Sequence, residues 1–268
     1  KACIKQGARC LDFEIYSVKN KPVIAASSVN DFDIKEMYNS VDFSEAIDII
    51  NNNAFSGSTC PNSYDPLILH FRIMSENKEI YNQMADTIYK TLGPKLLGKD
   101  YSYQYSGYNL GVIPLEILMG KVIIMIDKTN PLFESTPLAE YCNIATNSIF
   151  MRASRDYDIK YTPDMQELIE YNKKHMTLSM PDLGPNDTNV SAALHFKYGV
   201  QFVGMCFQNF DSNMEYYDIL FDKTGHAFIL KPEALRYIPV TIPAPKKQDP
   251  ALSYSTRPVK TDYYEFNV

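Results

Sequence analysis

The hydrophobic positions of this chain form two patterns. Short apolar runs, such as residues 122–126 within the segment 120–126, predict strands that are buried on both faces. Between them, apolar residues spaced three and four apart, as at positions 43, 46, 47 and 50, predict amphipathic helices. The predicted strands cover residues 11–16, 22–26, 66–71, 120–126, 200–208 and 226–230, and the predicted helices cover residues 43–50, 75–92 and 165–174.

Strands that alternate with helices predict an α/β fold with parallel strands. A chain of 268 residues is long enough for one (β/α)8 barrel of the TIM type. We expect this barrel over residues 1–238, incomplete at its N-terminus because the sequence begins without a methionine or a signal-like segment. The Pro- and Lys-rich composition that starts at Pro239 predicts an extended tail over residues 239–268.

Composition narrows the functional classes. The net charge of −6 and the pI of about 5.3 argue against a nucleic-acid-binding surface, which is strongly basic in most such proteins. The five cysteines are scattered without CxxC spacing, which favours reduced thiols and an intracellular protein. We recognise no secretory signal and no apolar run long enough to span a membrane.

Residue usage also bears on the source. The chain has 20 tyrosines, no tryptophan and asparagine runs such as residues 51–53. The codons for Asn, Ile, Lys, Tyr and Phe are AT-rich, so this bias indicates an AT-rich genome. Large DNA viruses and several protists share it.

The first predicted strand carries the strongest chemical pattern. Asp12 and Glu14 are two residues apart, so a strand directs both carboxylates to the same face. Such a pair can bind a metal ion. The next strand ends at Ala26, where a proton-transferring side chain would complete the site, and a methyl group cannot transfer a proton.

The order of several segments resembles the X and Y halves of eukaryotic phosphoinositide-specific phospholipase C. The resemblance implies a TIM barrel that cleaves a phosphodiester with calcium, two catalytic histidines and metal-binding carboxylates. It places an X-like half at about residues 1–128 and a Y-like half at about 180–238. The matching segments are residues 7–16, 21–24, 65–69, 118–124, 199–204 and 228–236.

The resemblance aligns the metal-site residues of the family with unsuitable residues here. Asp12 and Glu14 match two calcium carboxylates, whereas the third carboxylate position is Arg72, whose charge would repel calcium. The second catalytic histidine aligns with Ala26, and the first lies upstream of the matched segments. We therefore expect no catalytic residue and no cofactor, and we expect Arg72 or Arg9 to pair with the remaining carboxylates.

The positions aligned with the substrate-binding residues of the family have also lost the residues that bind phosphate. The phosphate-binding lysines of the family align with Met125 and Asp127, and only Thr188 and Asn189 remain of a Ser-Asn segment. Without these cations the charge-assisted contacts to an inositol phosphate are missing. We expect no substrate-binding residues.

These observations predict a catalytically inactive phospholipase-C-like barrel that serves as a structural or interaction module, with a minor capsid component of a large DNA virus as the most specific candidate. Two alternatives remain: a divergent calcium-dependent phosphoinositide phosphodiesterase, and a phospholipid-binding protein without hydrolysis. We expect little or no membrane binding and protein partners that bind the tail, because extended aromatic segments dock into grooves or add to sheets; a disordered terminus is the competing interpretation. The tail aromatics are Tyr254, Tyr263, Tyr264 and Phe266.

Overall fold

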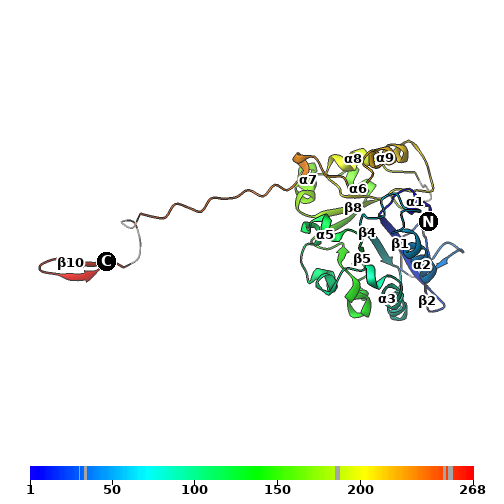
Figure 1. Cartoon of the computed structure of the whole chain (residues 1–268), viewed down its shortest axis with the longest axis horizontal. Coiled ribbons are helices and arrows are strands. Elements are labelled where there is room, and N and C mark those ends of the chain that lie inside the picture. The colour runs from blue at the N-terminus through cyan, green and yellow to red at the C-terminus, as the bar shows by residue number, and fades with distance from the viewer. Residues whose placement is uncertain (30, 33–34, 185–187, 250–251, 253–255) are drawn as a thin grey trace. The chain divides into compact units, whose positions relative to one another are not determined.

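The computed structural model describes residues 1–29, 31–32, 35–184, 188–249, 252 and 256–268. The chain divides into two units, Lys1–Arg236 and Tyr237–Val268 (Figure 1). Each unit is described by itself below. In the described residues, no helix is long and apolar enough to cross a membrane.

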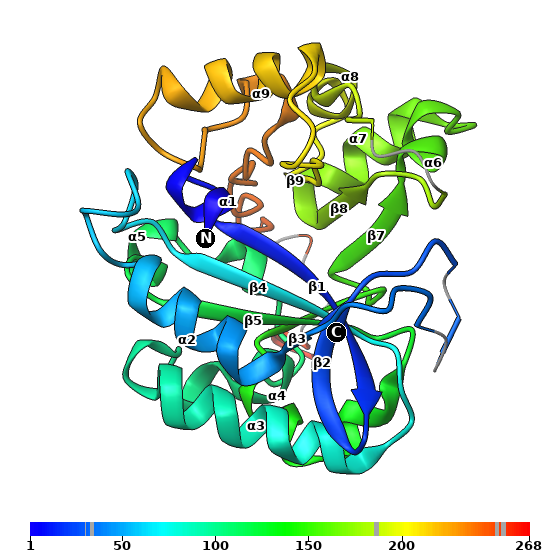
Figure 2. The same ribbon diagram turned by 90° about the vertical axis from the view of Figure 1, so that its right-hand side faces the viewer.

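The first unit is an α/β fold with two sheets (Figure 2). The larger sheet has the strand order β3-β2-β1-β4-β5-β6, in which β1, β4, β5 and β6 are parallel. The smaller sheet has the order β7-β8-β9 and is parallel throughout. Among the described strands no pairing joins the two sheets, so strand hydrogen bonds do not close a barrel. The strands are β1 (Cys10–Val18), β2 (Lys21–Ala25), β3 (Val41–Asp42), β4 (Leu67–Ile73), β5 (Val122–Asp127), β6 (Ile144–Thr146), β7 (Met151–Arg155), β8 (Met176–Met180) and β9 (Phe202–Val203).

One part of the larger sheet departs from the predicted parallel arrangement. β1 and β2 form an antiparallel hairpin. Its two-residue turn consists of Lys19 and Asn20, whose φ angles of 51° and 58° are the left-handed values that a tight hairpin with a matching twist requires. A connection this short cannot join parallel strands.

The alternation of side chains along β4 builds two separate cores. Leu67, Leu69 and Phe71 are buried on the outer face, where they pack with α2 (Phe43–Asn53) and α3 (Lys78–Leu92) (Figure 2). The inner face carries Ile68, which packs against Met125 of β5 and Leu178 of β8. Because both faces are buried, apolar residues occupy successive positions of β4, and the two exceptions are the buried polar residues His70 and Arg72.

The predicted helices are present, with one corrected start. Asn77, and not Ser75, caps α3, because the Asn77 side chain accepts a hydrogen bond from the Glu79 N–H. The other α-helices are α1 (Ala2–Lys5), α4 (Ser102–Tyr105), α5 (Leu115–Leu118), α6 (Asp156–Lys160), α7 (Met165–Lys174), α8 (Ala192–Lys197) and α9 (Ser212–Asp222). Short 3-10 turns are η1 (Gly93–Lys95), η2 (Lys99–Tyr101), η3 (Leu110–Val112), η4 (Pro131–Ser135), η5 (Pro137–Tyr141) and η6 (Glu233–Leu235).

Two strand predictions in the second half were wrong. The strand predicted over residues 200–208 is reduced to the two residues of β9. The segment 226–230 is not a strand; its Ala227 N–H donates to the Asp65 carboxylate. A strand needs a neighbour to accept its backbone hydrogen bonds, and no described strand pairs with this segment.

The second unit contains one small hairpin. β10 (Pro258–Lys260) pairs with β11 (Glu265–Asn267) in the antiparallel sense. Of the predicted interaction residues, Tyr263, Tyr264 and Phe266 are all exposed. Tyr254 lies outside the described residues.

Candidate functional site

The carboxylates predicted on the first strand meet a single guanidinium. Asp12 and Glu14 lie on β1, and Arg72 lies beside them on the parallel neighbour β4. Arg72 Nη2 donates to Asp12 Oδ2 at 2.6 Å and Nε donates to Asp12 Oδ1 at 3.0 Å, while Nη1 donates to Glu14 Oε1 at 2.6 Å. The predicted pairing with Arg72 is confirmed.

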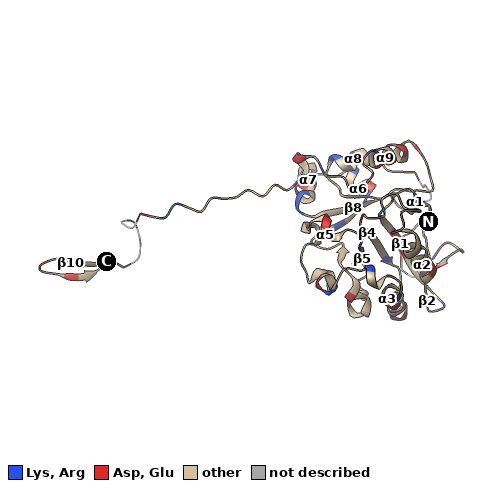
Figure 3. Cartoon of the chain, viewed as in Figure 1, with Lys and Arg blue, Asp and Glu red and all other residues tan. Residues whose placement is uncertain are grey.

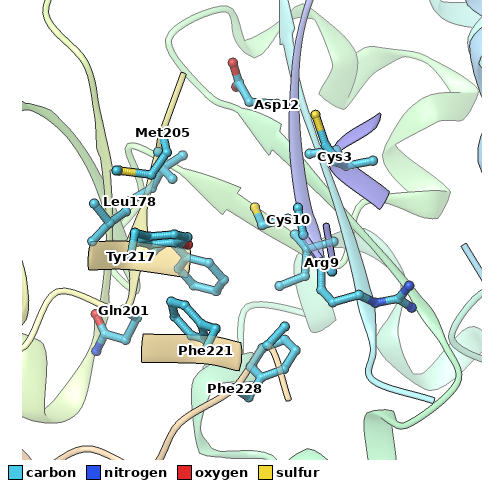
Figure 4. Close-up of a pocket in the computed structure, with 18 of the residues that line it drawn as sticks. Cys3, Arg9, Cys10, Asp12, Leu178, Gln201, Met205, Tyr217, Phe221 and Phe228 are labelled. Carbon is cyan, nitrogen blue, oxygen red and sulfur yellow. The ribbon is translucent and has the colours of Figure 1, made fainter. Parts of the chain in front are cut away.

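Arg9 does not take part in this cluster. Its guanidinium donates to the backbone carbonyls of Ala54, Asp65 and Pro66. Figure 4 shows the Arg9 guanidinium directed away from the side chains of the cavity. The prediction that Arg9 could pair with the carboxylates was wrong. Arg9 precedes β1, and its guanidinium donates its hydrogen bonds to backbone carbonyls of the loop before β4 instead.

A buried histidine completes the cluster. His70 is fully buried on β4, with Nδ1 at 2.7 Å from Asp12 Oδ1 and Nε2 at 3.1 Å from Thr146 Oγ1. Burial alone would raise the pKa of the Asp12 carboxyl, but the Arg72 charge and the His70 hydrogen bond outweigh it and hold that pKa well below its usual range. Asp12 is therefore ionised in the folded protein at neutral pH.

The second oxygen of Glu14 is also occupied. Glu14 Oε2 accepts the Ser27 N–H at 3.0 Å and the Tyr16 hydroxyl at 3.2 Å. Burial together with the Glu14 charge raises the pKa of Tyr16 to about 12, which keeps its hydroxyl protonated as a donor. Ala26 precedes Ser27 immediately and is exposed, so the backbone, and not a proton-transferring side chain, reaches Glu14 at this point.

The residues present do not fit a calcium ion. Calcium needs about six to eight oxygen ligands, usually from several carboxylates. All four carboxylate oxygens of Asp12 and Glu14 already accept hydrogen bonds, and Arg72 is positioned between the two groups. Among the described residues, no group of three or more His, Cys, Asp or Glu side chains is arranged to hold a metal ion.

The positions aligned with the substrate lysines serve packing and loop structure. Met125 is fully buried among the inner side chains. Asp127 Oδ1 accepts the Thr129 N–H and the Asn147 side-chain amide, both at 2.9 Å. Neither residue offers a cation to a phosphate.

The two residues aligned with the Ser-Asn segment differ in burial. Thr188 is exposed. Asn189 is buried; its Oδ1 accepts the Cys206 N–H, and its Nδ2 donates to the Asn209 carbonyl and to Asp211. Asn189 therefore holds the loop before α9.

Sequence reasoning missed a cation beside this cluster. Arg155 is the last residue of β7 and lines the same cavity as Asp12 and Arg72. Its Nη1 donates to the Pro181 carbonyl at 2.9 Å, and burial together with the Arg72 charge lowers its pKa. A basic residue at the carboxyl end of a parallel strand would have been a signal, but the polar Met151–Arg155 sequence did not predict a strand.

A second buried histidine forms a separate network. His195 Nδ1 lies 2.8 Å from Ser179 Oγ, and Nε2 lies 2.8 Å from Asp156 Oδ1. His195 and Ser179 are fully buried, and neither lines the cavity. The network ties α8 to β8 and α6, and it offers no accessible nucleophile.

A large cavity lies inside the first unit, with a volume of about 1290 Å³. Its walls come from β1, β8, β9 and α9 together with the segment after α9 (Figure 4). In Figure 4, Tyr217, Phe221 and Phe228 gather on one side and Cys10 points toward them. Burial and the nearby Asp12 charge raise the pKa of the Cys10 thiol to about 12, so it remains protonated. The charged residues Asp12, Arg72 and Arg155 also line this cavity.

Comparison with known families identifies the scaffold. The profile of the X domain of phosphatidylinositol-specific phospholipase C matches residues 1–128, and the profile of the Y domain matches residues 133–234. The chain belongs to the phosphatidylinositol-specific phospholipase C family. A search of curated protein sequences gives no significant match.

Solved structures agree with this family at the level of fold. PLC21 from L. pealei and from S. officinalis each superpose with a TM-score of 0.68 at 19% identity, covering 88% of this chain and 34% of theirs. A calcium-dependent phosphoinositol-specific phospholipase C from Pseudomonas sp. superposes with a TM-score of 0.50 at 9% identity, covering 77% of this chain and 83% of that enzyme. The chain spans about a third of the length of the two PLC21 proteins.

Proposed function

We propose that this phospholipase-C-like chain is not a catalyst, and that it serves as a structural or interaction module. The observation that carries the proposal is the position of Arg72, whose guanidinium binds both carboxylates that would otherwise face a metal ion. A guanidinium supplies positive charge to these carboxylates, but it has no vacant coordination position for a substrate oxygen or for a nucleophile.

The acid–base groups at this site support the same proposal. Ala26 has no titratable group. His70 is fully buried, and both of its ring nitrogens lie within hydrogen-bond distance of protein oxygens. A general base must reach the proton that it removes, directly or through one water molecule. His70 does not meet this requirement.

The proposal also covers where the protein acts and which partners it contacts. We expect an intracellular protein with protein neighbours that contact its exposed tail aromatics, and we name a virion component of a large DNA virus as the specific case. Acidic and basic residues are interspersed along the chain, which supports neither nucleic-acid binding nor strong attraction to a membrane (Figure 3). The tail aromatics that the structure describes support a docking role through their exposure.

A second candidate is binding of an anionic headgroup without hydrolysis, and Arg155 favours it. This guanidinium lines the cavity next to Arg72, and among the described residues it forms no ion pair. Arginine recognises phosphate through paired N–H donors. Vesicles that contain phosphatidylinositol phosphate should then bind the protein, and Arg155→Ala should weaken that binding more than the surface control Arg152→Ala.

The test of inactivity is a hydrolysis assay with the full chain. The purified protein is incubated with phosphatidylinositol vesicles in calcium-containing and in calcium-free buffer, and release of inositol phosphate is measured. We expect no release above the protein-free background in either buffer. Calcium-stimulated release that Asp12→Asn abolishes would refute the proposal and would establish the alternative of a divergent calcium-dependent phosphodiesterase.

A further inference from the structure

The segment that follows the first unit is rich in proline and exposed. Residues 237–249 include Pro239, Pro243 and Pro245, and every residue in this range is exposed and lies outside any helix or strand (Figure 1). Within the described part of the chain, residues 238–247 form no hydrogen bond and no ion pair. The backbone and side chains of this segment are therefore available to a partner.

The prolines restrict the backbone of this segment. A proline ring fixes φ near about −65°, and the residue before a proline is held in the β or polyproline II region. Ile238, Ile242 and Ala244 each precede a proline. Most of the stretch 238–245 is therefore preset to an extended conformation, and polyproline II is the regular conformation of this kind that needs no internal hydrogen bond.

A polyproline II helix would group the apolar side chains on two adjacent faces. It has about three residues per turn, so residues three apart share a face. Pro239, Ile242 and Pro245 would lie on one face, and Val240 and Pro243 on the next. Ile242 and Val240 are 85% and 82% exposed. Together these residues would form a continuous apolar surface that no described residue covers.

A pair of lysines follows the apolar residues. Lys246 and Lys247 are next to Pro245, and residues 237–248 contain no Asp or Glu. The segment is basic, whereas the whole chain has a net charge of −6. A complementary partner surface is apolar along most of its length and acidic at one end.

We propose that residues 239–247 are a polyproline II ligand that binds an aromatic-lined groove with an acidic end on a partner protein. SH3 and WW domains bind proline-rich segments in such grooves, because the preformed ligand loses little entropy on binding. The inference rests on the proposed interaction role of the tail and gives it a class of partner. It does not depend on the inactivity of the charged cluster.

A passive spacer accounts less well for this sequence. Proline-rich linkers separate domains through the stiffness of their backbone, for which polar side chains serve equally well. Here Val240 and Ile242 occupy positions between the prolines, and both side chains are exposed. Large apolar side chains in these positions favour a binding role.

Strand addition is the other extended mode of recognition. Side chains of a strand alternate between two faces, which would group Ile238 with Val240 and Ile242. The φ of proline is the value of polyproline II, about −75°, and not that of a strand, about −120° to −140°. Three prolines within residues 239–245 therefore favour polyproline II.

The experiment compares two matched serine variants of the full chain. Val240→Ser changes an apolar face of the proposed helix, whereas Ile238→Ser changes the third face, which also carries Thr241. Both variants replace an exposed β-branched side chain, so neither should disturb the first unit. The probes are purified SH3 and WW domains with acidic residues beside the groove, and binding is measured by isothermal titration calorimetry.

The proposal predicts a distinct pattern of binding. We expect at least one of these domains to bind the unaltered chain. Val240→Ser and Pro243→Ala should each weaken that binding about tenfold, because each removes a group that fills the groove, and Ile238→Ser should change it less than about twofold. Added salt should weaken binding, and Lys246→Gln should reduce this salt dependence.

Several results would overturn the proposal. Failure of every domain to bind is one, and equal losses in Ile238→Ser and Val240→Ser are another, because strand addition places these two residues on the same face. Binding that is lost in a double variant, Tyr263→Ser with Phe266→Ser, but kept in Val240→Ser would assign the partner to the tail aromatics and leave the proposed function intact. Binding to vesicles of phosphatidylserine and phosphatidylcholine that Lys246→Gln weakens and Val240→Ser does not would assign the segment to a membrane surface.

Discussion

Replacement of Arg72 by methionine is the most informative single change. The side chain is nine-tenths buried and makes three close bonds to Asp12 and Glu14. Removing one partner of a buried ion pair costs about 3–5 kcal/mol. The Asp12 side chain is 34% exposed, so water can partly resolvate it, and we reduce the expected loss to about 2–4 kcal/mol.

The loss is measured by thermal unfolding. For a chain of this size, about 2–4 kcal/mol corresponds to a Tm lowered by about 4–16 °C. The matched control is Arg152→Met, which removes an arginine paired with Glu167 at a half-exposed position and should cost about 1 kcal/mol. If both changes lowered the Tm by the same small amount, the reasoning would be refuted, because the ion pairs of Arg72 would then contribute no more to stability than an exposed pair.

The variant Arg72→Glu tests the metal argument in the opposite direction. It places a third carboxylate beside Asp12 and Glu14, where the oxygen ligands of calcium would converge. We expect calcium to raise the Tm of Arg72→Glu, because a ligand that binds only the folded state stabilises it, and to leave the unaltered protein unchanged. A similar rise in both proteins would show that Arg72 does not replace the ion.

Three further predictions follow from individual side chains. The pKa of Asp12 is held low in the folded state, so the unfolded chain binds more protons in acid. Stability that is present at neutral pH should therefore be lost as the pH falls below about 5. In urea unfolding measured at a series of pH values, Asp12→Asn should flatten this part of the dependence. Burial lowers the pKa of Lys231 to about 8, so the unfolded chain binds more protons than the folded chain above that pH. The free energy of unfolding should therefore rise between about pH 8 and 10, and this rise should be smaller in Lys231→Met. Asn189→Ala removes the bonds to Cys206, Asn209 and Asp211 and should cost about 2–3 kcal/mol in urea unfolding. A stable Asn189→Ala protein with altered vesicle binding would instead give this residue a ligand-binding role.

The sequence predicted those parts of the fold that depend on local patterns. Both faces of β4 and β5 are buried, and the apolar runs 67–69 and 122–126 made these strands recognisable in the sequence. β7 was missed because four of its five residues are only partly buried and the strand is rich in polar residues. The segment 226–230 has strand-like residues, but a strand forms only when a neighbour accepts its hydrogen bonds, and no sequence pattern reports that neighbour.

The candidate site shows the same division. The side-by-side placement of Asp12 and Glu14 follows from their spacing on one strand, and the pairing with Arg72 follows from charge once the strands are adjacent. The hydrogen bonds of His70 could not be predicted, because Thr146 is 76 positions away along the chain and meets it only through the order of strands in the sheet. Contacts of this kind depend on topology, which a single sequence specifies weakly.

The cation that holds Asp12 and Glu14 is covalently part of the chain. A bound divalent ion exchanges with solvent, so a chelator can withdraw it and a fall in its free concentration can empty its site. Arg72 has no such exchange and no dissociation constant, and its pKa is raised further above its usual range by the two carboxylates despite the opposing effect of burial. If the site binds no metal, as we propose, a chelator should leave the charge balance at this end of β1 unchanged, whereas acid that protonates Asp12 should alter it.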